Sequence, residues 1–146
     1  MGGHPYWYFT KYTGDVNEAL QILRDREFRA GRYNPVMRFI NFPLDANSPS
    51  PGAQHNSIAA ALKASGDDGT RSILDIEKIG TQPRYRVAVP LDENYLLSLY
   101  GTTRPSRQTV ENLDFLEDVD RGHCVYVTIY KDDEPDELLF AGYSFD

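Results

Sequence analysis

Hydrophobic and polar positions in the early part of the chain follow two different periods. Residues 6–13 combine aromatic and β-branched side chains and end at Gly14, which predicts a β-strand. Asp15 then stands three positions before Glu18, the spacing of a capping box at a helix start. Beyond it, five apolar residues share one face at helical spacing: Val16, Ala19, Leu20, Leu23 and Ala30. Gly31 predicts the end of this helix.

The middle of the chain predicts short elements separated by turns rich in Gly, Pro and Asp. The predicted elements are a helix over 58–64, strands over 71–79 and 85–89, a helix from Asp92 to Gly101, and a helix that begins at Thr103 or Ser106 and turns Val110, Leu113, Leu116 and Val119 toward the core. Ahead of them, residues 41–56 contain three prolines and a glycine among Asn, Ser and Asp. They predict a long Pro-rich loop, which we expect to be the most mobile internal segment.

The end of the chain has the pattern of a β-hairpin. Residues 124–130 alternate, with Val125, Val127 and Ile129 on one face, and residues 131–136 form a charged turn. The return segment, residues 137–143, is apolar on both faces, which is typical of a strand covered on both sides. We therefore predict a single α+β domain over residues 1–146. Its sheet should be mainly antiparallel, with helices packed on it and the C-terminal hairpin in a central position.

Composition and charge narrow the classes of partner. The chain has 146 residues, a net charge of −7 and one cysteine. The acidic balance argues against nucleic acid or an anionic membrane as partner, since both need basic patches. No run reaches the ~18 apolar residues of a membrane span, and no signal peptide is evident. A lone cysteine suggests a reducing compartment, so we expect a cytoplasmic protein in which Cys124 is a buried structural thiol.

Motifs that specify a reaction are missing from the sequence. The three histidines occur in different segments, without the spacing of a metal site. There is no phosphate-binding loop and no nucleophile elbow. We therefore expect no metal and no cofactor, and whether the protein is an enzyme stays open.

Glu27 breaks the helical pattern, because it falls near the centre of the apolar face. A buried carboxylate needs a partner. One interpretation is a ligand pocket formed by Glu27, Arg32 and Tyr33. The other is a structural ion pair, for which Arg71, Arg84 and Arg86 are the candidate partners.

A second candidate is the segment around Arg104 and Arg107. Two arginines at a predicted helix start are suited to an anion, because free backbone N–H groups and the helix dipole act together. The alternative is a helix cap with solvated arginines.

Two resemblances bear on function. Residues 26–33 (REFRAGRY), 72–76 (SILDI), 101–105 (GTTRP) and 140–146 (FAGYSFD) resemble stretches of a group of small hypothetical bacterial proteins of no known activity. This resemblance implies a bacterial origin. A looser one is with ADP-ribosyltransferases, in which Ser72 and Glu137 would fill two family positions, while the early basic position is offered only by His4 or Lys11.

Two functional hypotheses follow. The first is a small acidic protein that binds a protein partner, of the immunity or antitoxin type, in keeping with the charge and the ten tyrosines. The second is a small-molecule enzyme with a pocket around Glu27, Arg32 and Tyr33. A deep polar pocket that contains Glu27 would favour the enzyme. The sequence leaves the partner and the oligomeric state open.

Overall fold

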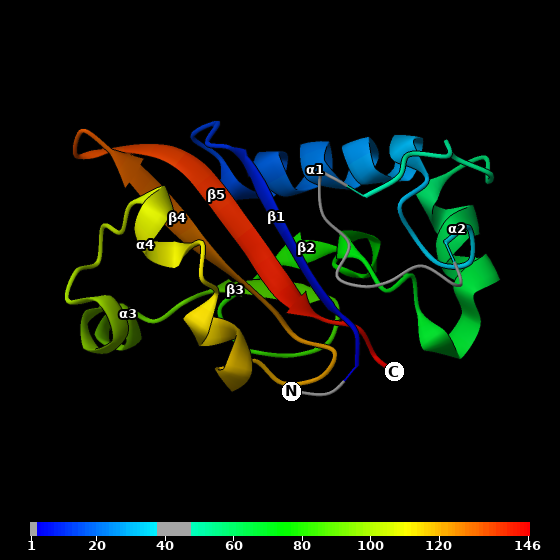
Figure 1. Cartoon of the computed structure of the whole chain (residues 1–146). Helices are drawn as coiled ribbons and strands as arrows, with labels where there is room; N and C mark the ends of the chain where they lie inside the picture. Colours follow the sequence, from blue (N-terminus) through cyan, green and yellow to red (C-terminus); the bar gives the residue numbers. More distant parts are fainter. Residues whose placement is uncertain (1–2, 38–47) are drawn as a thin grey trace.

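One five-stranded sheet organises the chain (Figure 1). The computed structural model describes residues 3–37 and 48–146. Its strands are β1 (Pro5–Lys11), β2 (Lys78–Ile79), β3 (Val87–Pro90), β4 (Cys124–Lys131) and β5 (Glu134–Tyr143). Its helices are α1 (Val16–Ala30), α2 (Ile58–Ser65), α3 (Glu93–Tyr100) and α4 (Arg107–Val110), with 3-10 turns η1 (Gly66–Asp68), η2 (Ile73–Asp75) and η3 (Asp114–Asp118).

The strand order is β1-β5-β4-β3-β2. The long strands β1, β5 and β4 pair antiparallel, whereas the short strands β3 and β2 join parallel to β4 and to each other. The prediction of a single α+β domain is confirmed. The sheet itself is mixed, so "mainly antiparallel" holds for its long strands only. The hairpin β4–β5 occupies the second and third positions of the sheet, which agrees in part with a central place.

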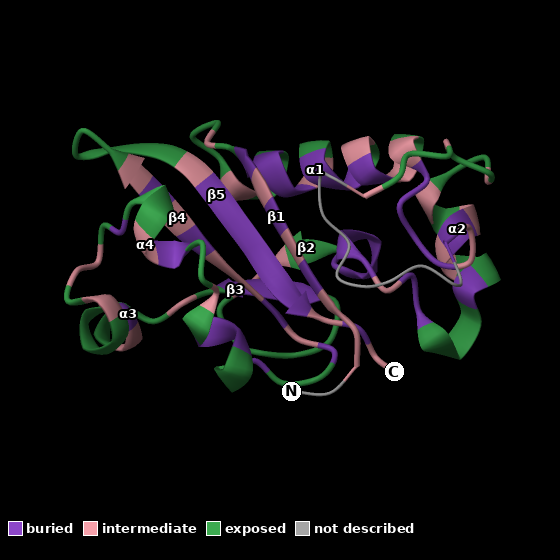
Figure 2. Cartoon of the chain, in the orientation of Figure 1, coloured by how far each residue is buried: buried purple, intermediate pink, exposed green. Residues whose placement is uncertain are grey.

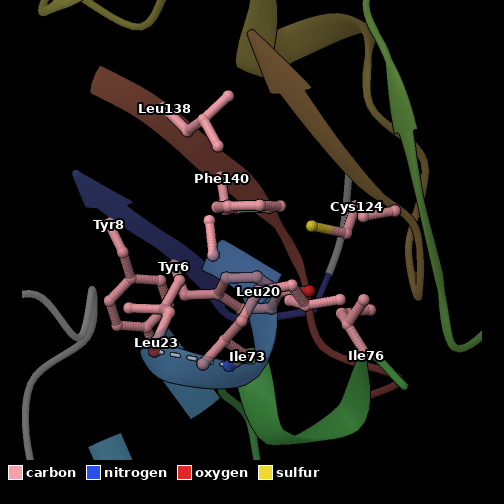
Figure 3. Close-up of a cluster of buried hydrophobic side chains, with 11 residues drawn as sticks. Tyr6, Tyr8, Leu20, Leu23, Ile73, Ile76, Cys124, Leu138 and Phe140 are labelled. Carbon is pink, nitrogen blue, oxygen red and sulfur yellow. Dashed lines mark hydrogen bonds between the residues drawn. The ribbon is translucent and has the colours of Figure 1, made fainter. Parts of the chain in front are cut away.

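Side chains alternate between two apolar clusters on opposite faces of the sheet. Tyr6 and Tyr8 belong to a cluster that α1 and η2 cover, with Leu20, Leu23 and Ile73 in its centre (Figure 3). The intervening residues Trp7 and Phe9 pack on the other face, against a second cluster. The buried members of that cluster are Leu96, Val110, Phe115, Leu116, Val119, Val127, Ile129, Leu139 and Ala141.

Strand β5 is buried on both faces, as its sequence predicts. Residues 138–142 are all buried, while the hairpin tip is exposed (Figure 2). Leu138 and Phe140 enter the cluster under α1, and Leu139 and Ala141 enter the other one. On β4, Val127 and Ile129 share a face and Tyr126 lies on the opposite one, which confirms the predicted alternation.

Helix α1 begins and ends where its sequence predicts. The Asp15 carboxylate accepts a hydrogen bond from the Glu18 N–H at 3.1 Å, and Gly31 closes the helix in the left-handed conformation, with φ of 75°. A Cβ on Gly31 would overlap the backbone of Gly52. The same Gly52 donates its N–H to the Ala30 carbonyl at 2.9 Å, so the loop before α2 passes directly over the end of α1.

Two predicted elements are wrong in extent. The strand expected over 71–79 is the turn η2 followed by the two-residue strand β2. Ser72 caps η2 by accepting the Leu74 N–H at 3.2 Å, which turns the chain where extended pairing was expected. The helix expected after Ser106 ends at Val110, because Leu113 takes a left-handed backbone conformation before η3 begins.

The predicted Pro-rich loop is described only in part. Residues 48–56 contain no helix or strand, as expected. Residues 41–47 of the predicted loop lie outside the described residues.

Candidate functional site

A cavity of about 360 Å³ lies between α2, η2 and the C-terminal segment. We call it the Asp75 pocket. Its lining residues are Leu62, Ser65, Gly66, Asp67, Gly69, Asp75, Tyr85, Arg86 and Phe145. They come from four separate parts of the chain, and the volume is at the lower end of the range for ligand sites.

Asp75 is the chemically distinctive residue of this pocket, because its side chain is only half satisfied. Asp75 is only 3% exposed to solvent. Oδ1 accepts hydrogen bonds from the Thr70 N–H at 2.7 Å and from the Thr70 hydroxyl at 2.8 Å. Oδ2 is buried without a hydrogen-bond partner in the part of the chain that the structure describes. Buried polar atoms are normally paired, so an acceptor that lines a cavity in this state is suited to a donor from a ligand.

Burial raises the pKa of Asp75 from its ordinary value. The Thr70 hydrogen bonds, the Arg86 charge and the nearby Arg71 backbone N–H act in the opposite direction without cancelling that effect. The side chain is held in place by a buried hydroxyl chain, in which the Ser72 and Thr70 hydroxyls lie 2.8 Å apart. The carboxylate is therefore fixed in orientation and destabilised in its charged form.

Tyr85 and Phe145 form the aromatic wall of the pocket. Their ring centroids lie 5.2 Å apart and the ring planes meet at 81°. Arg86 places its guanidinium 5.7 Å from the Phe145 centroid and 3.6 Å from the Glu77 carboxylate. Tyr85 is 59% exposed, so much of its ring is available to a ligand.

Gly69 has no side chain, and this leaves space next to the unpaired Oδ2 of Asp75. A Cβ at this position would lie 2.8 Å from Asp75 Oδ2 and 2.7 Å from the Phe145 ring. The backbone here has a φ of 73°, which glycine adopts without strain. Asn34 holds this segment, because its side-chain amide donates to the Gly69 carbonyl at 2.9 Å.

The C-terminal segment is anchored so that Phe145 stays in the wall. Ser144 donates its N–H to the His4 carbonyl at 3.0 Å, and its hydroxyl oxygen accepts the His4 N–H at 2.8 Å. Arg71 forms an ion pair with Asp146, and this bond lowers the pKa of the Asp146 carboxyl. Arg71 and Arg86 both have positive φ, at 54° and 69°, a kind of backbone strain that clusters at functional sites.

The predicted pocket around Glu27 is occupied by internal contacts instead. Glu27 is fully buried, and its two oxygens accept hydrogen bonds of 2.7 Å from Nε and Nη2 of Arg32. Arg26 adds a third contact at 3.0 Å. The ion-pair interpretation is confirmed, but the partners are these two arginines rather than Arg71, Arg84 or Arg86. We call this group the Glu27 clamp.

Tyr33 extends the clamp to the loop before α2. Its buried hydroxyl lies 2.8 Å from His55 Nδ1 and accepts the Gln54 N–H at 3.3 Å. Arg32 donates to the Ser50 hydroxyl at 3.0 Å. The structure thus brings Glu27, Arg32 and Tyr33 together, in an arrangement that joins two segments of the chain.

Arg104 and Arg107 lie at the other end of the sheet, next to the hairpin. Arg104 bonds Asp133 at 2.8 Å, and Arg107 bonds Glu137 at 2.7 Å. Arg107 also lies 3.9 Å above the Phe9 ring. Helix α4 has only four residues, and Ser106 caps it by accepting the Thr109 N–H. Both arginines are therefore already paired with carboxylates. They lie at the end of the sheet opposite to the Asp75 pocket.

The positions suggested by ADP-ribosyltransferases are brought together only in part, because Lys11 pairs with Glu137 across β1 and β5 while the other two lie elsewhere. Ser72 is fully buried in the hydroxyl chain beside Asp75. His4 bonds Ser144 near the end of β5, whereas Glu137 stands near its start. At strand spacing these two positions are roughly 20 Å apart.

Cys124 is the buried thiol that its sequence context predicts. It is 1% exposed, and burial raises its pKa to about 12. Within residues 3–37 and 48–146, no three His, Cys, Asp or Glu side chains are grouped so that they could hold a metal ion.

Asp75 could have been found by the rule that singled out Glu27. It is a carboxylate between Leu74 and Ile76, where burial is costly. The remaining pocket residues carry no such signal, because Tyr85, Arg86 and Phe145 reach the pocket only through the fold.

Comparison of the chain with protein-family models, curated proteins and solved structures found no match. The bacterial origin implied by the short resembling runs stays a prediction. None of the described helices combines the length and the apolar character needed to cross a bilayer.

Proposed function

We propose that the protein binds a small planar ligand with N–H donors, and that this ligand occupies the Asp75 pocket. The observation that carries the proposal is the buried, unpaired Oδ2 of Asp75 beside a cavity of about 360 Å³. A ligand donor would satisfy this oxygen, and it would stabilise the charge that burial disfavours.

Charge and shape support a donor rather than an anion. Two carboxylates, Asp75 and Asp67, line the pocket against one guanidinium, Arg86, which itself lies 3.6 Å from Glu77. The Tyr85 ring, which meets Phe145 edge to face, offers its own flat apolar face to a planar group, and ring faces also attract cations. An amidine, a guanidine or an amino-substituted heteroaromatic ring combines these properties.

The geometry gives less support to an enzyme centred on Glu27. Both of its oxygens accept hydrogen bonds from arginines, and it lines none of the three cavities described within residues 3–37 and 48–146. A protein partner of the immunity or antitoxin type stays a prediction, and a ligand in the Asp75 pocket is compatible with such a partner.

Benzamidine tests the proposal, because it presents an amidinium on a flat ring. We expect it to bind the wild-type protein with a Kd of about 1 mM, a typical scale for a fragment of this size. Asp75→Asn should weaken binding at least ~10-fold, since the amide turns a donor toward the ligand in place of Oδ2. Tyr85→Ala should weaken it as well. Protein-observed NMR titration measures all three affinities.

Benzoate is the matched control, because it has the same ring and no N–H donor. It should bind more weakly than benzamidine, and Asp75→Asn should not weaken it. Equal benzamidine affinity in the wild type and in a folded Asp75→Asn variant would show that Oδ2 does not hold the ligand.

A further inference from the structure

A second hollow, of about 420 Å³, adjoins the Asp75 pocket. It is lined by Pro83, Arg84, Tyr85, Asp120, Arg121 and His123. Tyr85 belongs to both linings, so its ring is the wall that the two hollows share. We call the second one the Arg84 hollow.

The two hollows carry opposite charge. Two carboxylates and one guanidinium line the Asp75 pocket, whereas Arg84 and Arg121 face a single carboxylate, Asp120, in the Arg84 hollow. Within the described ranges, neither of these two arginines forms an ion pair. This contrasts with Arg104 and Arg107, which are both paired with carboxylates.

The shared wall packs against two neighbouring rings. The Tyr85 ring packs against Phe145 on the pocket side, and its centroid lies 5.8 Å from that of His123 on the other side. Gly122 makes room for it, because a Cβ there would overlap the Tyr85 ring. A ligand that lies along Tyr85 can therefore reach both hollows at once.

We propose, on the basis of the proposed function, that the ligand also carries an anionic group and binds it in the Arg84 hollow. Its class is an amino-substituted heteroaromatic ring with a phosphate, the chemistry of a nucleotide. The ring places its N–H donors against Asp75 and its face against the Tyr85 ring. The phosphate accepts hydrogen bonds from Arg84 and Arg121.

The net charge makes this placement selective. A chain with a net charge of −7 repels anions on balance, so an anionic ligand depends on a local excess of arginine. Guanidinium groups bind phosphate through charge-assisted, often bidentate hydrogen bonds. Because the acidic pocket and the basic hollow lie on either side of Tyr85, the ligand can bind in only one orientation.

Guanosine and guanosine monophosphate separate the two contributions. Both present the same N–H donor edge, and only the second has the phosphate. We expect the monophosphate to bind the wild type at least ~10-fold more tightly, which corresponds to about 1.4 kcal/mol. In Arg84→Gln/Arg121→Gln the monophosphate and guanosine should bind with roughly equal affinity, and the affinity for guanosine should be unchanged. Isothermal titration calorimetry at low ionic strength measures both affinities, and added salt should reduce the advantage.

Asp75→Asn and Arg104→Gln/Arg107→Gln are the controls. Asp75→Asn should weaken both compounds by the same factor and keep their ratio, while the second double variant should change neither. A phosphate advantage that is absent from the wild type, persists without Arg84 and Arg121, or is lost with Arg104 and Arg107 overturns the inference. So does a failure of guanosine to bind while benzamidine binds through Asp75, which leaves the proposed function in place.

Discussion

Glu27 and Asp75 are both buried carboxylates, and their surroundings give them different roles. Glu27 has both oxygens bonded to arginines, so its charge is matched where it is buried. Asp75 has one oxygen bonded to Thr70 and one without a partner. Removing one member of a buried ion pair leaves the other charge unmatched and destabilises the fold, whereas a carboxylate that is already unpaired costs stability that a ligand can restore.

The two carboxylates should respond differently to amide substitution. Glu27→Gln leaves Arg32 buried opposite a neutral group, so we expect a loss of about 3–5 kcal/mol in the free energy of unfolding. Asp75→Asn keeps an acceptor for the Thr70 donors and removes an unmatched charge, so it should change stability little or raise it. Urea unfolding of the wild type and both variants measures the difference. A large loss for Asp75→Asn and none for Glu27→Gln would reverse the two assignments.

At the scale of elements, the clamp explains how a loop with little regular structure is held. Arg32 reaches Ser50, Tyr33 reaches His55, and Gly31 lies against Gly52. Each contact starts at the end of α1 and crosses to the segment before α2. Helix α1 therefore positions α2, whose Leu62 and Ser65 line one side of the Asp75 pocket.

Strand β5 is the element on which the fold depends most. It pairs with β1 on one side and with β4 on the other, and its buried residues enter both apolar clusters. Removal of residues 138–146 would separate β1 from the rest of the sheet and open both clusters. We expect this truncation to abolish cooperative thermal unfolding, monitored by far-UV circular dichroism. A truncated chain that still melts cooperatively would mean that β5 is dispensable.

At the scale of the whole molecule, the fold gathers acidic and basic side chains in different places, whereas the composition gives only their net charge. The net charge is −7, yet Arg84 and Arg121 share a hollow beside the acidic Asp75 pocket. The two termini of the described chain meet at this place, because the His4 and Ser144 backbones are hydrogen-bonded. The candidate site is therefore a product of the complete tertiary structure.

Two carboxyls near these termini should give the molecule opposite pH responses. Burial raises the pKa of Asp75, so its contribution to stability is fully present below the unfolded value of about 3.9 and is lost as pH rises through the folded pKa. As pH increases from about 4, the free energy of unfolding of Asp75→Asn should therefore rise relative to that of the wild type. Arg71 lowers the pKa of Asp146, so that contribution is present above about 3.9 and is lost as pH falls through the folded pKa.

Urea unfolding at several pH values from about 2 to 8 measures these differences, because the two contributions change on opposite sides of the unfolded pKa of about 3.9. Asp146→Asn should lose stability at neutral pH and match the wild type in acid. Its effect should be small, because the Asp146 side chain is 30% exposed and its ion pair is screened. Parallel pH profiles for the wild type and Asp75→Asn would contradict the raised pKa of Asp75.

Local patterns in the sequence determined the elements whose signals lie within a few residues. The ends of α1 follow from Asp15 and Gly31, and the hairpin follows from the alternation on β4 and the apolar run on β5. The need of Glu27 for an ionic partner was also visible, because a carboxylate on an apolar helix face breaks a local rule. These features depend on spacing, which a sequence states directly.

Only the tertiary structure decided the rest. It chose Arg32 and Arg26 as partners of Glu27, replaced most of a predicted strand with the turn at Asp75, and ended α4 early at Val110. It also placed Tyr85 and Phe145 beside Asp75, although long stretches of chain separate them. The physical reason is that pairing and pocket formation depend on which surfaces are buried against each other, and that depends on contacts between distant residues, which local propensity does not specify.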